Sequence, residues 1–363
     1  MIFILCQDYP NKNHKYAMSY VHSRNIVYKA RDLDITVVSM SAKESYSYEE
    51  IKVITKSDFH KLIRAGHLSS SDIVVSHAPN VRSHIPCINK VYSKVKQIIV
   101  VFHGHEVLYT SKYYPKPYDF KKTSKFKKAI YNIYDFFKIK ILKKLLLKIN
   151  KVKKLKIIFV SEWMKTQAAF CLNIDVDQFD TYVINNNANM NFLINNYSRE
   201  SNTLADFITV RPLDESKYSI DLVVEFAKCN PELKFHIYGK GMYFKYNEKP
   251  ENIEVFNEFI SPKDFPLLLN KYKCAIMPTR LDAQGVMVCE IATYGMPVVT
   301  SNIEVCQEML GEFKNVYLVD LNFFHQKVDL NFIEKNIDIK NEQNAKFDIE
   351  NTVEKEVEIL KMT

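Results

Sequence analysis

Two carboxylic acids, Asp282 and Glu290, stand eight positions apart in the segment 274–310, where an apolar run, a Pro-Thr-Arg break and a Gln-Gly turn precede a predicted helix. Eight residues span slightly more than two helical turns, so we expect both carboxylates close to one helix face. Free backbone N–H groups at the start of such a helix attract anions. Carboxylates that accept sugar hydroxyls beside N–H groups that hold phosphate would bind a nucleotide sugar. The alternative is an ordinary strand–helix–strand unit with two solvated acids.

Two basic residues earlier in the chain offer partners for a diphosphate. Arg211 directly follows the predicted strand 207–210, and Lys217 precedes a helix predicted to begin near Ser219. Arginine can hold a phosphate with two parallel hydrogen bonds, while lysine acts as a compact point charge. Both would also stabilise a leaving nucleoside diphosphate as its charge develops. We therefore favour phosphate binding over the alternative of two solvated loop residues.

A histidine ends another predicted buried strand. His103 and His105 follow the run 97–102, which places His103 at the strand's carboxyl end. Neutral imidazole can donate or accept a hydrogen bond near pH 7, so His103 is a candidate to contact a substrate. Together with Glu106 the two histidines could also bind a metal, but further ligands are not apparent, and we expect no metal site. The alternative is that both are ordinary loop histidines.

Glycine is scarce, at seven residues, which makes its positions informative. It is needed where the backbone adopts a positive φ or where a ligand comes close to the main chain. Gly239 opens a Gly-Lys-Gly turn after the predicted strand 233–238, and Gly285 lies in the turn between the two acids. We expect both turns to border a ligand, although Gly239 could also mark a plain strand-to-loop turn. The chain has neither a Gly-x-Gly-x-x-Gly fingerprint nor a Walker lysine loop, which argues against NAD and ATP sites.

These segments resemble the signature of the retaining glycosyltransferases of family 4, in which two acids are separated by seven residues. The family's first acid is usually Glu before a Gly-Phe-Gly-like turn, whereas here Asp282 precedes Ala-Gln-Gly. The tail Gly295–Val299 and Glu290 match the family well. The segment with Arg211 and Lys217 resembles its Gly-Arg-Leu-x-x-x-Lys-Gly block, with Val210 and Tyr218 in place of the glycines. The resemblance implies these donor-site roles: Arg211 and Lys217 for the diphosphate, Gly239 beside the nucleotide, Asp282 and His103 for the transferred sugar, Gln284, Gly285 and Val286 for sugar and phosphate, and Glu290 for the ribose.

The resemblance implies a retaining, metal-independent transfer of a hexose from a nucleotide diphosphate sugar, with a UDP-sugar favoured. No cofactor is implied, because the nucleotide sugar is a substrate. The acceptor would be a saccharide, lipid-linked in our interpretation, in the synthesis of a bacterial surface polysaccharide or lipopolysaccharide. Three alternatives stay open: a nucleotide-sugar epimerase of the same fold, an α-glucan synthase or sucrose-type enzyme with a soluble acceptor, and a non-catalytic membrane-associated protein of the same fold.

Alternating β-branched runs and helical segments predict an α/β chain with parallel sheets. We expect the GT-B fold of two Rossmann-like domains facing each other across a cleft. The expected divisions are an acceptor-side domain 1–190, a linker 191–205, a nucleotide-sugar-binding domain 206–335, and a helical tail 336–363 that could cross back to the first domain. Two Asp-x-Asp sequences, at 32–34 and 175–177, are interpreted as solvated turns, so a divalent metal is not required.

The basic residues are unevenly distributed. The formal net charge is +8, yet residues 121–156 hold fourteen lysines, no arginine and one acid, Asp135. Apolar residues recur there at three- and four-residue steps, which predicts a basic amphipathic helix on the inner membrane surface or, alternatively, a solvated domain helix. Nucleic acid is not an expected partner, because stacking aromatics interleaved with arginines are absent. No stretch is long and apolar enough to span a bilayer, and seven scattered cysteines fit a reducing compartment, so we expect a cytoplasmic, peripheral membrane protein.

Overall fold

The computed structural model describes residues 1–258, 260–328 and 344–362, and the chain forms two compact units. Unit 1 comprises Met1–Lys112, Phe126–Asn187 and Asp348–Thr363, and unit 2 comprises Tyr113–Lys125 and Ala188–Phe347.

Unit 1 is built on an eight-stranded sheet in the order β3-β4-β2-β1-β5-β6-β7-β8. All neighbouring pairs are parallel except β3 and β4. Its central strands are continuous apolar runs that are buried along their whole length, as expected for a parallel sheet covered on both faces. The strands are β1 (Ile2–Cys6), β2 (Ile35–Ser39), β3 (Tyr46–Tyr48), β4 (Ile51–Thr55), β5 (Ile73–His77), β6 (Gln97–Phe102), β7 (Leu155–Phe159) and β8 (Asp180–Val183).

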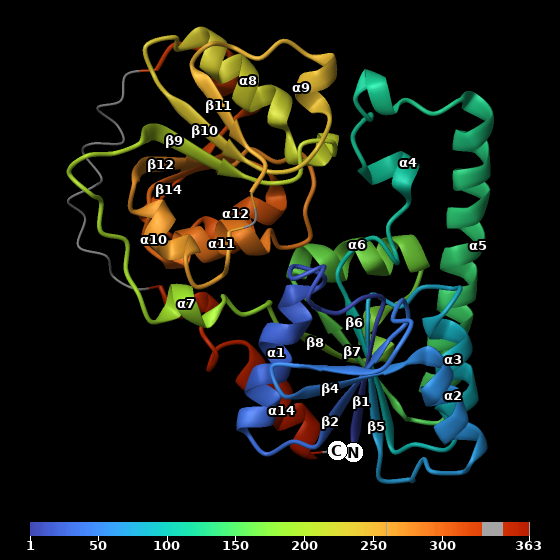
Figure 1. The fold of residues 1–363 in the computed structure, drawn as a ribbon. Coiled ribbons are helices and arrows are strands. Elements are labelled where there is room, and N and C mark those ends of the chain that lie inside the picture. Colours follow the sequence, from blue (N-terminus) through green and yellow to red (C-terminus); the bar gives the residue numbers. More distant parts are fainter. Residues whose placement is uncertain (259, 329–343, 363) are drawn as a thin grey trace. The chain divides into compact units, whose positions relative to one another are not determined.

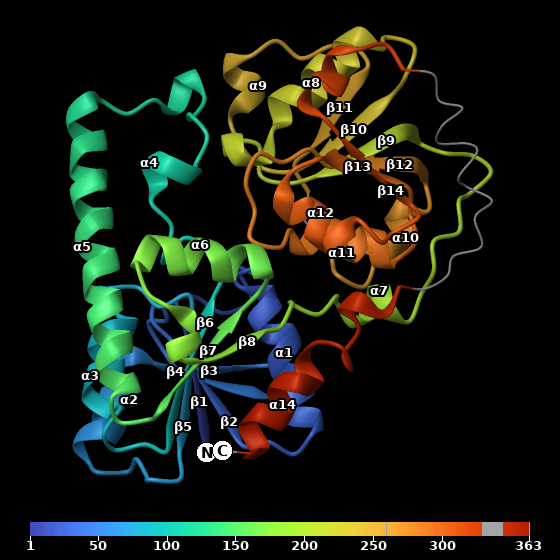
Figure 2. The same cartoon turned by 180° about the vertical axis from the view of Figure 1, so that it is seen from behind.

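Helices cover both faces of this sheet. Helices α1 (Ser19–Ala30) and α14 (Val353–Met362) lie on one side, and α2 (Lys56–Arg64), α3 (His84–Val91) and the second half of α5 (Lys125–Asn150) lie on the other (Figures 1 and 2). Thus the last helix of the chain packs beside the first. The remaining elements are α4 (Thr110–Tyr113), α6 (Glu162–Leu172) and the 3₁₀ turn η2 (Val176–Gln178).

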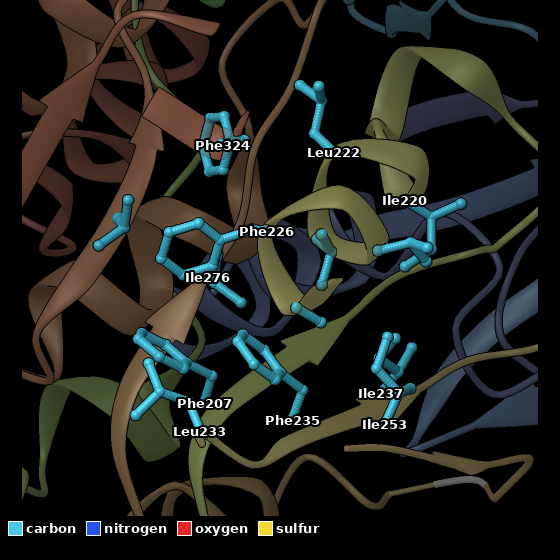
Figure 3. Packing of buried hydrophobic residues seen from close by; sticks show 14 of the residues in the cluster. Phe207, Ile220, Leu222, Phe226, Leu233, Phe235, Ile237, Ile253, Ile276 and Phe324 are labelled. Carbon is cyan, nitrogen blue, oxygen red and sulfur yellow. The ribbon is translucent and has the colours of Figure 1, made fainter. Parts of the chain in front are cut away.

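Unit 2 is built on a six-stranded parallel sheet in the order β11-β10-β9-β12-β13-β14. Its core is a cluster of buried aromatic and aliphatic side chains around Phe207, Phe226 and Phe235 (Figure 3). The strands are β9 (Ala205–Val210), β10 (Phe235–Tyr238), β11 (Ile253–Phe256), β12 (Tyr272–Ile276), β13 (Val298–Ser301) and β14 (Val316–Val319). The helices are α7 (Met190–Leu193), α8 (Ile220–Cys229), α9 (Tyr243–Tyr246), α10 (Phe265–Leu269), α11 (Val286–Thr293) and α12 (Glu304–Leu310), with 3₁₀ turns η1 (Asp119–Lys121), η3 (Ser216–Tyr218), η4 (Leu321–His325) and η5 (Ala345–Phe347).

The structure confirms the expected α/β class with two largely parallel sheets. In the division into compact units, residues 188–205, expected as the end of the first domain and the linker, belong to unit 2. The other difference is that residues 113–125 also belong to unit 2, although the expected first domain ran to 190. Aromatic packing accounts for the difference, because Tyr118 and Phe120 contact the core of unit 2. Part of the expected tail, 336–343, lies outside the described residues, and Asp348–Thr363 belongs to unit 1.

The predicted basic helix exists as α5, but its two halves differ. Leu145 and Ile149 in its second half are buried against unit 1. In its first half, by contrast, Phe126 is 74% exposed and Ile133 is 58% exposed. The apolar stripe predicted from the sequence therefore enters the core of unit 1 only along the second half of the helix.

Candidate functional site

The candidate site of unit 2 begins at the point where its strand order reverses. Strand β9 is central, the chain continues outward through β10 and β11, and it then returns to place β12 on the other side of β9. Loops that leave neighbouring strands in opposite directions open a crevice at their carboxyl ends, which is where α/β sheets bind ligands. Arg211 directly follows β9 and the segment 277–285 follows β12, so both predicted halves of the donor site come from this switch point.

Arg211 joins these two loops. Its side chain is 8% exposed, and Nη1 donates to the backbone carbonyls of Tyr218 and Pro278. Burial lowers the pKa of Arg211 to about 10, while the nearby Tyr218 and Asp282 oppose that change. The guanidinium therefore remains charged at neutral pH and is held by neutral carbonyls. Among the described residues, no carboxylate lies within ion-pair distance of it.

Lys217 lies in the turn η3, which is fastened to the loop after β12. The Lys217 carbonyl accepts hydrogen bonds from Thr279 Oγ1 at 3.0 Å and from the Arg280 backbone N–H at 2.8 Å. The Lys217 ammonium lies over the Tyr218 ring, 4.6 Å from its centroid. The structure thus fixes the backbone that carries both predicted cations.

Asp282 organises the turn before α11. Its Oδ1 accepts hydrogen bonds from the N–H groups of Ala283 at 2.8 Å and Gln284 at 3.3 Å. Gly285 then caps the helix with φ +75°, a left-handed conformation that favours glycine. Gln284 is buried, and Val286 begins α11, so three of the predicted contact residues form the helix entrance.

Glu290 lies in α11 about one turn beyond that entrance, and because the helix begins at Val286, Asp282 lies in the turn before it. The expectation that both acids would lie close to one helix face is therefore wrong. Its Oε1 accepts a hydrogen bond from the Asn189 backbone N–H at 3.0 Å. Burial raises the pKa of Glu290 to about 7, although the Asn189 bond opposes that rise. At neutral pH this carboxyl group therefore titrates, a property that solvated surface acids lack.

The pKa values of two buried cysteines, Cys289 and Cys306, depend on the predicted charges. The pKa of Cys289 is raised by burial and by the neighbouring Cys306, Asp282 and Glu290. The pKa of Cys306 is raised to about 12 by burial and then by Asp282, while Arg211 lowers it. Asp282 thus influences both thiols, whereas Glu290 acts on that of Cys289 and Arg211 on that of Cys306.

Gly239 has a packing role in addition to any ligand role. A Cβ atom there would lie 2.0 Å from the Arg211 carbonyl oxygen, and one at Gly241 would lie 2.7 Å from Asp214 Oδ1. The Gly-Lys-Gly turn thus lets the loop after β10 pack against the loop that follows β9. This close approach explains both glycines without reference to a nucleotide.

In unit 1 the predicted His103 lies among buried polar groups. Its Nε2 is 3.1 Å from Nδ1 of His77, the last residue of β5, and its ring packs against Tyr20 with centroids 4.7 Å apart. Burial, and then the charge of Arg24, hold the pKa of His103 well below its ordinary value. The pair is neutral, so His103 can donate or accept a hydrogen bond but carries no charge at pH 7.

The loop that carries His103 is held by the middle of α5. Glu106 accepts hydrogen bonds from the N–H groups of His103 and Gly104. Lys138, paired with Asp135 at 2.8 Å, donates to the carbonyls of His105 and Leu108. The sole acid of the lysine segment is therefore part of a buried ion pair that supports this loop.

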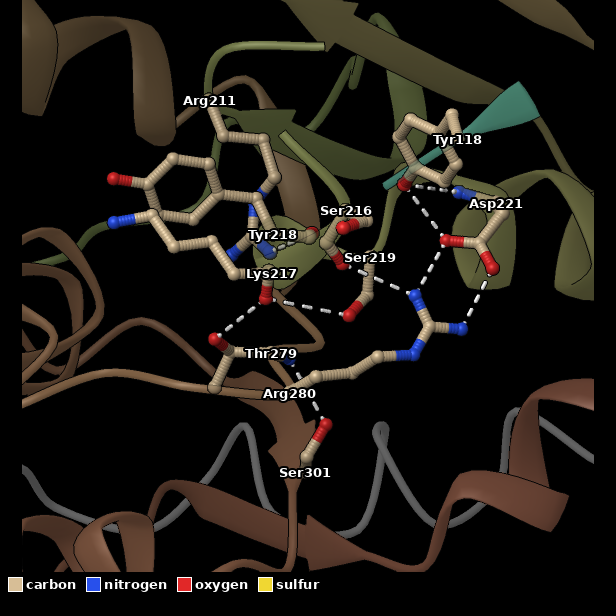
Figure 4. A network of polar contacts seen from close by, with 10 residues as sticks. All are labelled: Tyr118, Arg211, Ser216, Lys217, Tyr218, Ser219, Asp221, Thr279, Arg280 and Ser301. Atoms are coloured by element: carbon tan, nitrogen blue, oxygen red, sulfur yellow. Dashed lines mark hydrogen bonds and ion pairs between the residues drawn. The ribbon is translucent and has the colours of Figure 1, made fainter. Parts of the chain in front are cut away.

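Unit 2 contains a second polar network that was not predicted from the sequence. Arg280 forms two hydrogen bonds with Asp221, at 2.7 and 2.6 Å, and Tyr118 donates to the same carboxylate at 2.8 Å (Figure 4). Asp221 and Arg280 lie within the stretches singled out from the sequence, but neither has a motif of its own. Tyr118 is about a hundred positions away, and nothing in its surroundings signals this contact.

In the part of the chain that the structure describes, no group of three or more His, Cys, Asp or Glu side chains is arranged to hold a metal ion. None of the helices in that part combines the length and the apolar character needed to cross a membrane.

Comparison with known proteins gives a family for part of unit 2 and a fold for the chain. Residues 196–334 match the family described as Glycosyl transferases group 1, so unit 2 contains a glycosyltransferase domain and that expectation is confirmed for these residues. No curated protein sequence matches the chain.

Solved structures show the same fold at low sequence identity. Sucrose-phosphate synthase from Thermosynechococcus elongatus aligns with a TM-score of 0.66 and 10% identity over 99% of this chain and 98% of its own. WaaG, described as a glycosyltransferase involved in lipopolysaccharide biosynthesis, aligns with a TM-score of 0.62 and 11% identity over 99% of each chain. TarM aligns with a TM-score of 0.52 and 16% identity over 83% of this chain, which spans only 57% of the TarM chain. These likenesses confirm the GT-B fold.

Proposed function

We propose that this chain, which carries a glycosyl transferases group 1 domain in a GT-B fold, is a retaining and metal-independent glycosyltransferase. It would move a hexose from a nucleotide diphosphate sugar, with a UDP-sugar favoured, to a lipid-linked saccharide in the synthesis of a bacterial polysaccharide or lipopolysaccharide. One observation carries the proposal: at the switch point of unit 2 the buried Arg211 joins the loop after β9 to the loop after β12, and the latter leads through Asp282 into α11, the helix that holds Glu290.

The proposed donor contacts follow from the charges at this switch point. Arg211 and Lys217 would bind the diphosphate, because neither cation is neutralised by a carboxylate among the described residues. The N–H groups at the entrance of α11 add partial positive charge for phosphate or sugar oxygens. Glu290 would bind the ribose hydroxyls and Asp282 the hydroxyls of the transferred sugar.

In the proposed reaction the bond between the sugar's anomeric carbon and the diphosphate oxygen breaks, and the acceptor oxygen bonds to that carbon on the same face. The leaving phosphate takes the acceptor's proton, so no separate protein base is required. Arg211 and Lys217 would stabilise the charge that develops on the diphosphate. The neutral His103 would orient the sugar through a hydrogen bond.

The first half of α5 supports a membrane surface as the place of the acceptor. Phe126, Ile133 and Phe137 are exposed, and lysines at 125, 127 and 128 surround the start of the helix. Exposed aromatic side chains can enter the headgroup region, and each lysine contributes about 1 kcal/mol near an anionic surface. We therefore propose a peripheral position on the cytoplasmic face of the inner membrane.

The donor assignment is tested by following nucleotide release from UDP-sugars, with and without lipid-linked acceptor. The wild type should release UDP faster when acceptor is present, and Asp282→Ala and Glu290→Ala should lower that rate by at least about a hundredfold. Normal rates in both variants would show that the assignment is wrong. Turnover of free UDP-sugar to an isomer, without acceptor, would instead support the epimerase.

The membrane assignment is tested by sedimentation with vesicles of phosphatidylglycerol and of phosphatidylcholine. Binding to the anionic vesicles should fall in the double variant Phe126→Ala, Phe137→Ala. Phe170→Ala on α6 is a matched control, because this phenylalanine is 63% exposed but lies on another helix. Equal binding by the double variant and the control would contradict the proposed surface.

A further inference from the structure

The segment Tyr113–Lys125, which we name the strap, belongs to unit 2 although the residues on both sides of it belong to unit 1. Its aromatic side chains pack on α9. The Phe120 ring stacks on Tyr246 with centroids 5.0 Å apart, and the Tyr118 ring meets Tyr243 edge to face, also at 5.0 Å. Such pairs contribute beyond the area that they bury. The strap is therefore built into the nucleotide-sugar unit.

A series of hydrogen bonds connects the strap to the loop after β12. Tyr118 donates to Asp221 Oδ1 at 2.8 Å, and the two oxygens of Asp221 accept from Nη1 and Nη2 of Arg280 at 2.7 and 2.6 Å (Figure 4). The two bonds from Arg280 fix the orientation of both groups. The Arg280 and Tyr118 bonds lower the pKa of Asp221 against the effect of burial, so the carboxylate is charged.

The same series of hydrogen bonds ends at the turn that carries Lys217. Arg280 Nη1 donates to the Ser216 carbonyl at 3.2 Å, and the Arg280 backbone N–H donates to the Lys217 carbonyl at 2.8 Å. Arg211 donates to the Tyr218 carbonyl on the other side of this turn. The carbonyls of three consecutive residues of η3 are thus held by two arginines, and one of these arginines is oriented through the strap.

We propose that the strap is a positioning element of the donor site and that Tyr118 is its positioning residue. Tyr118 touches neither Lys217 nor Arg211. It acts through Asp221 and Arg280, which set the backbone of the turn that presents the diphosphate-binding lysine. This inference rests on the proposed function, because it assumes that Lys217 binds a nucleoside diphosphate. Strap docking and donor affinity would then be coupled, and a change at Tyr118 would weaken the donor without removing any donor contact.

The test is Tyr118→Phe, which removes the hydroxyl and keeps the ring that packs on Tyr243. Calorimetric titration with UDP, GDP and ADP should show a dissociation constant about three- to tenfold higher than that of the wild type, the range for one lost hydrogen bond. Tyr246→Phe is the matched control, because Tyr246 stacks on the strap at Phe120 but is 55% exposed and makes no contact with Asp221. It should bind like the wild type.

Two further measurements separate positioning from general loosening. In donor hydrolysis, KM should rise with the dissociation constant while kcat stays within about twofold of the wild type. In a double-mutant cycle, Asp221→Asn should weaken binding, and Tyr118→Phe should add little in the Asp221→Asn background, because both act through one series of hydrogen bonds. Additive effects would overturn the inference.

Hydrogen exchange distinguishes failure of this inference from failure of the proposed function. Backbone amides in 216–221 should exchange faster in Tyr118→Phe than in Tyr246→Phe, with or without nucleotide. If the wild type binds nucleotide but Tyr118→Phe leaves either the exchange rates or the affinity unchanged, the role of Tyr118 alone is overturned. A wild type that binds no nucleoside diphosphate would overturn both the donor site and the strap's part in it.

Discussion

The carboxyl ends of the two sheets carry different kinds of charge. Both sheets reverse their strand order beside the first strand of the unit, at β1 in unit 1 and at β9 in unit 2. In unit 1 the buried Arg24 is neutralised by Glu356 at 2.9 Å, and the neighbouring His103 is neutral. In unit 2 the buried Arg211 is held by carbonyl oxygens and keeps its charge without a carboxylate partner among the described residues.

This difference separates a charge that stabilises the fold from one that is available to a ligand. A buried ion pair satisfies both of its members, so neither attracts a further charged group. A guanidinium held only by neutral carbonyls keeps its electrostatic field for an incoming anion. The two sheets share this topology, but the charged side chains at their carboxyl ends differ. We therefore expect the diphosphate to bind in unit 2, where the arginine has no carboxylate partner among the described residues.

The largest effect should come from breaking the ion pair of unit 1. Arg24 and Glu356 join α1 to α14, and both side chains are almost fully buried. Removing one partner leaves an uncompensated buried charge, so Arg24→Ala should lower the free energy of unfolding by about 3 to 5 kcal/mol. Urea unfolding measures this change. Nucleotide affinity of the folded variant should stay unchanged, because the pair lies in unit 1.

The same two helices provide a matched control. Arg31 and Glu354 also form an ion pair between α1 and α14, at 3.0 Å, but Arg31 is 43% exposed. Exposed pairs contribute less than about 1 kcal/mol, so Arg31→Ala should have little effect on stability. A loss of stability in Arg31→Ala equal to that in Arg24→Ala would show that burial does not distinguish the two pairs.

The next effect concerns the acid of unit 2 and its dependence on pH. Burial raises the pKa of Glu290 from its ordinary 4.5 to about 7. Between these values the folded chain binds a proton that the unfolded chain has released, so stability falls as pH rises from about 4.5 to 7 and is constant above. The change is at most about 3 kcal/mol, and solvent near the carboxyl reduces it. In Glu290→Gln, the stability of unit 2 measured by hydrogen exchange should depend less on pH over this window than in the wild type. An unchanged pH dependence would show that another group causes it.

Much of this site could be predicted from the sequence because its signals are local. Arg211 directly follows a strand, and Asp282 and Gly285 mark the turn that precedes α11. The parallel sheets likewise follow from continuous apolar runs. What could not be predicted depends on contacts between distant segments. Tyr118 reaches Asp221 across more than a hundred residues.

The lysine segment shows the limit of periodicity. Its apolar repeat predicts a helix, and α5 is one, but the repeat is the same in both halves while the burial is not. A repeat reports which side chains share a helix face and leaves open what covers that face. Strands β3, β4, β8 and β14 were not predicted. In β3 and β8 most residues are part-exposed, so their sequences lack a continuous apolar run.

A smaller effect, on UDP affinity, should distinguish the predicted diphosphate-binding Lys217 from an exposed lysine of the same unit. Lys217→Ala should raise the dissociation constant for UDP by about thirtyfold, near 2 kcal/mol, because a charge-assisted contact is lost. Its stability should change little, since the Tyr218 ring is the ammonium's one contact among the described residues. Lys240→Ala in the exposed Gly-Lys-Gly turn is the control for overall charge. Equal losses of affinity in both variants would indicate a diffuse electrostatic effect without a defined diphosphate site.

The smallest effect tests whether the two units respond oppositely to pH. His84 begins α3 in unit 1, and it is buried with no partner for either ring nitrogen among the described residues. Burial, and then the charge of Lys56, lower its pKa from 6.5 to about 3. The unfolded chain gains a proton below pH 6.5 that the folded chain does not, so stability is lost as pH falls through 6.5, by about 1 kcal/mol at pH 6. His84→Phe removes this titration, so hydrogen exchange in unit 1 should change less between pH 7.5 and 6 than in the wild type. If the variant keeps the wild-type pH dependence, His84 does not cause it. An opposite pH response of the two units would then have to come from another histidine of unit 1.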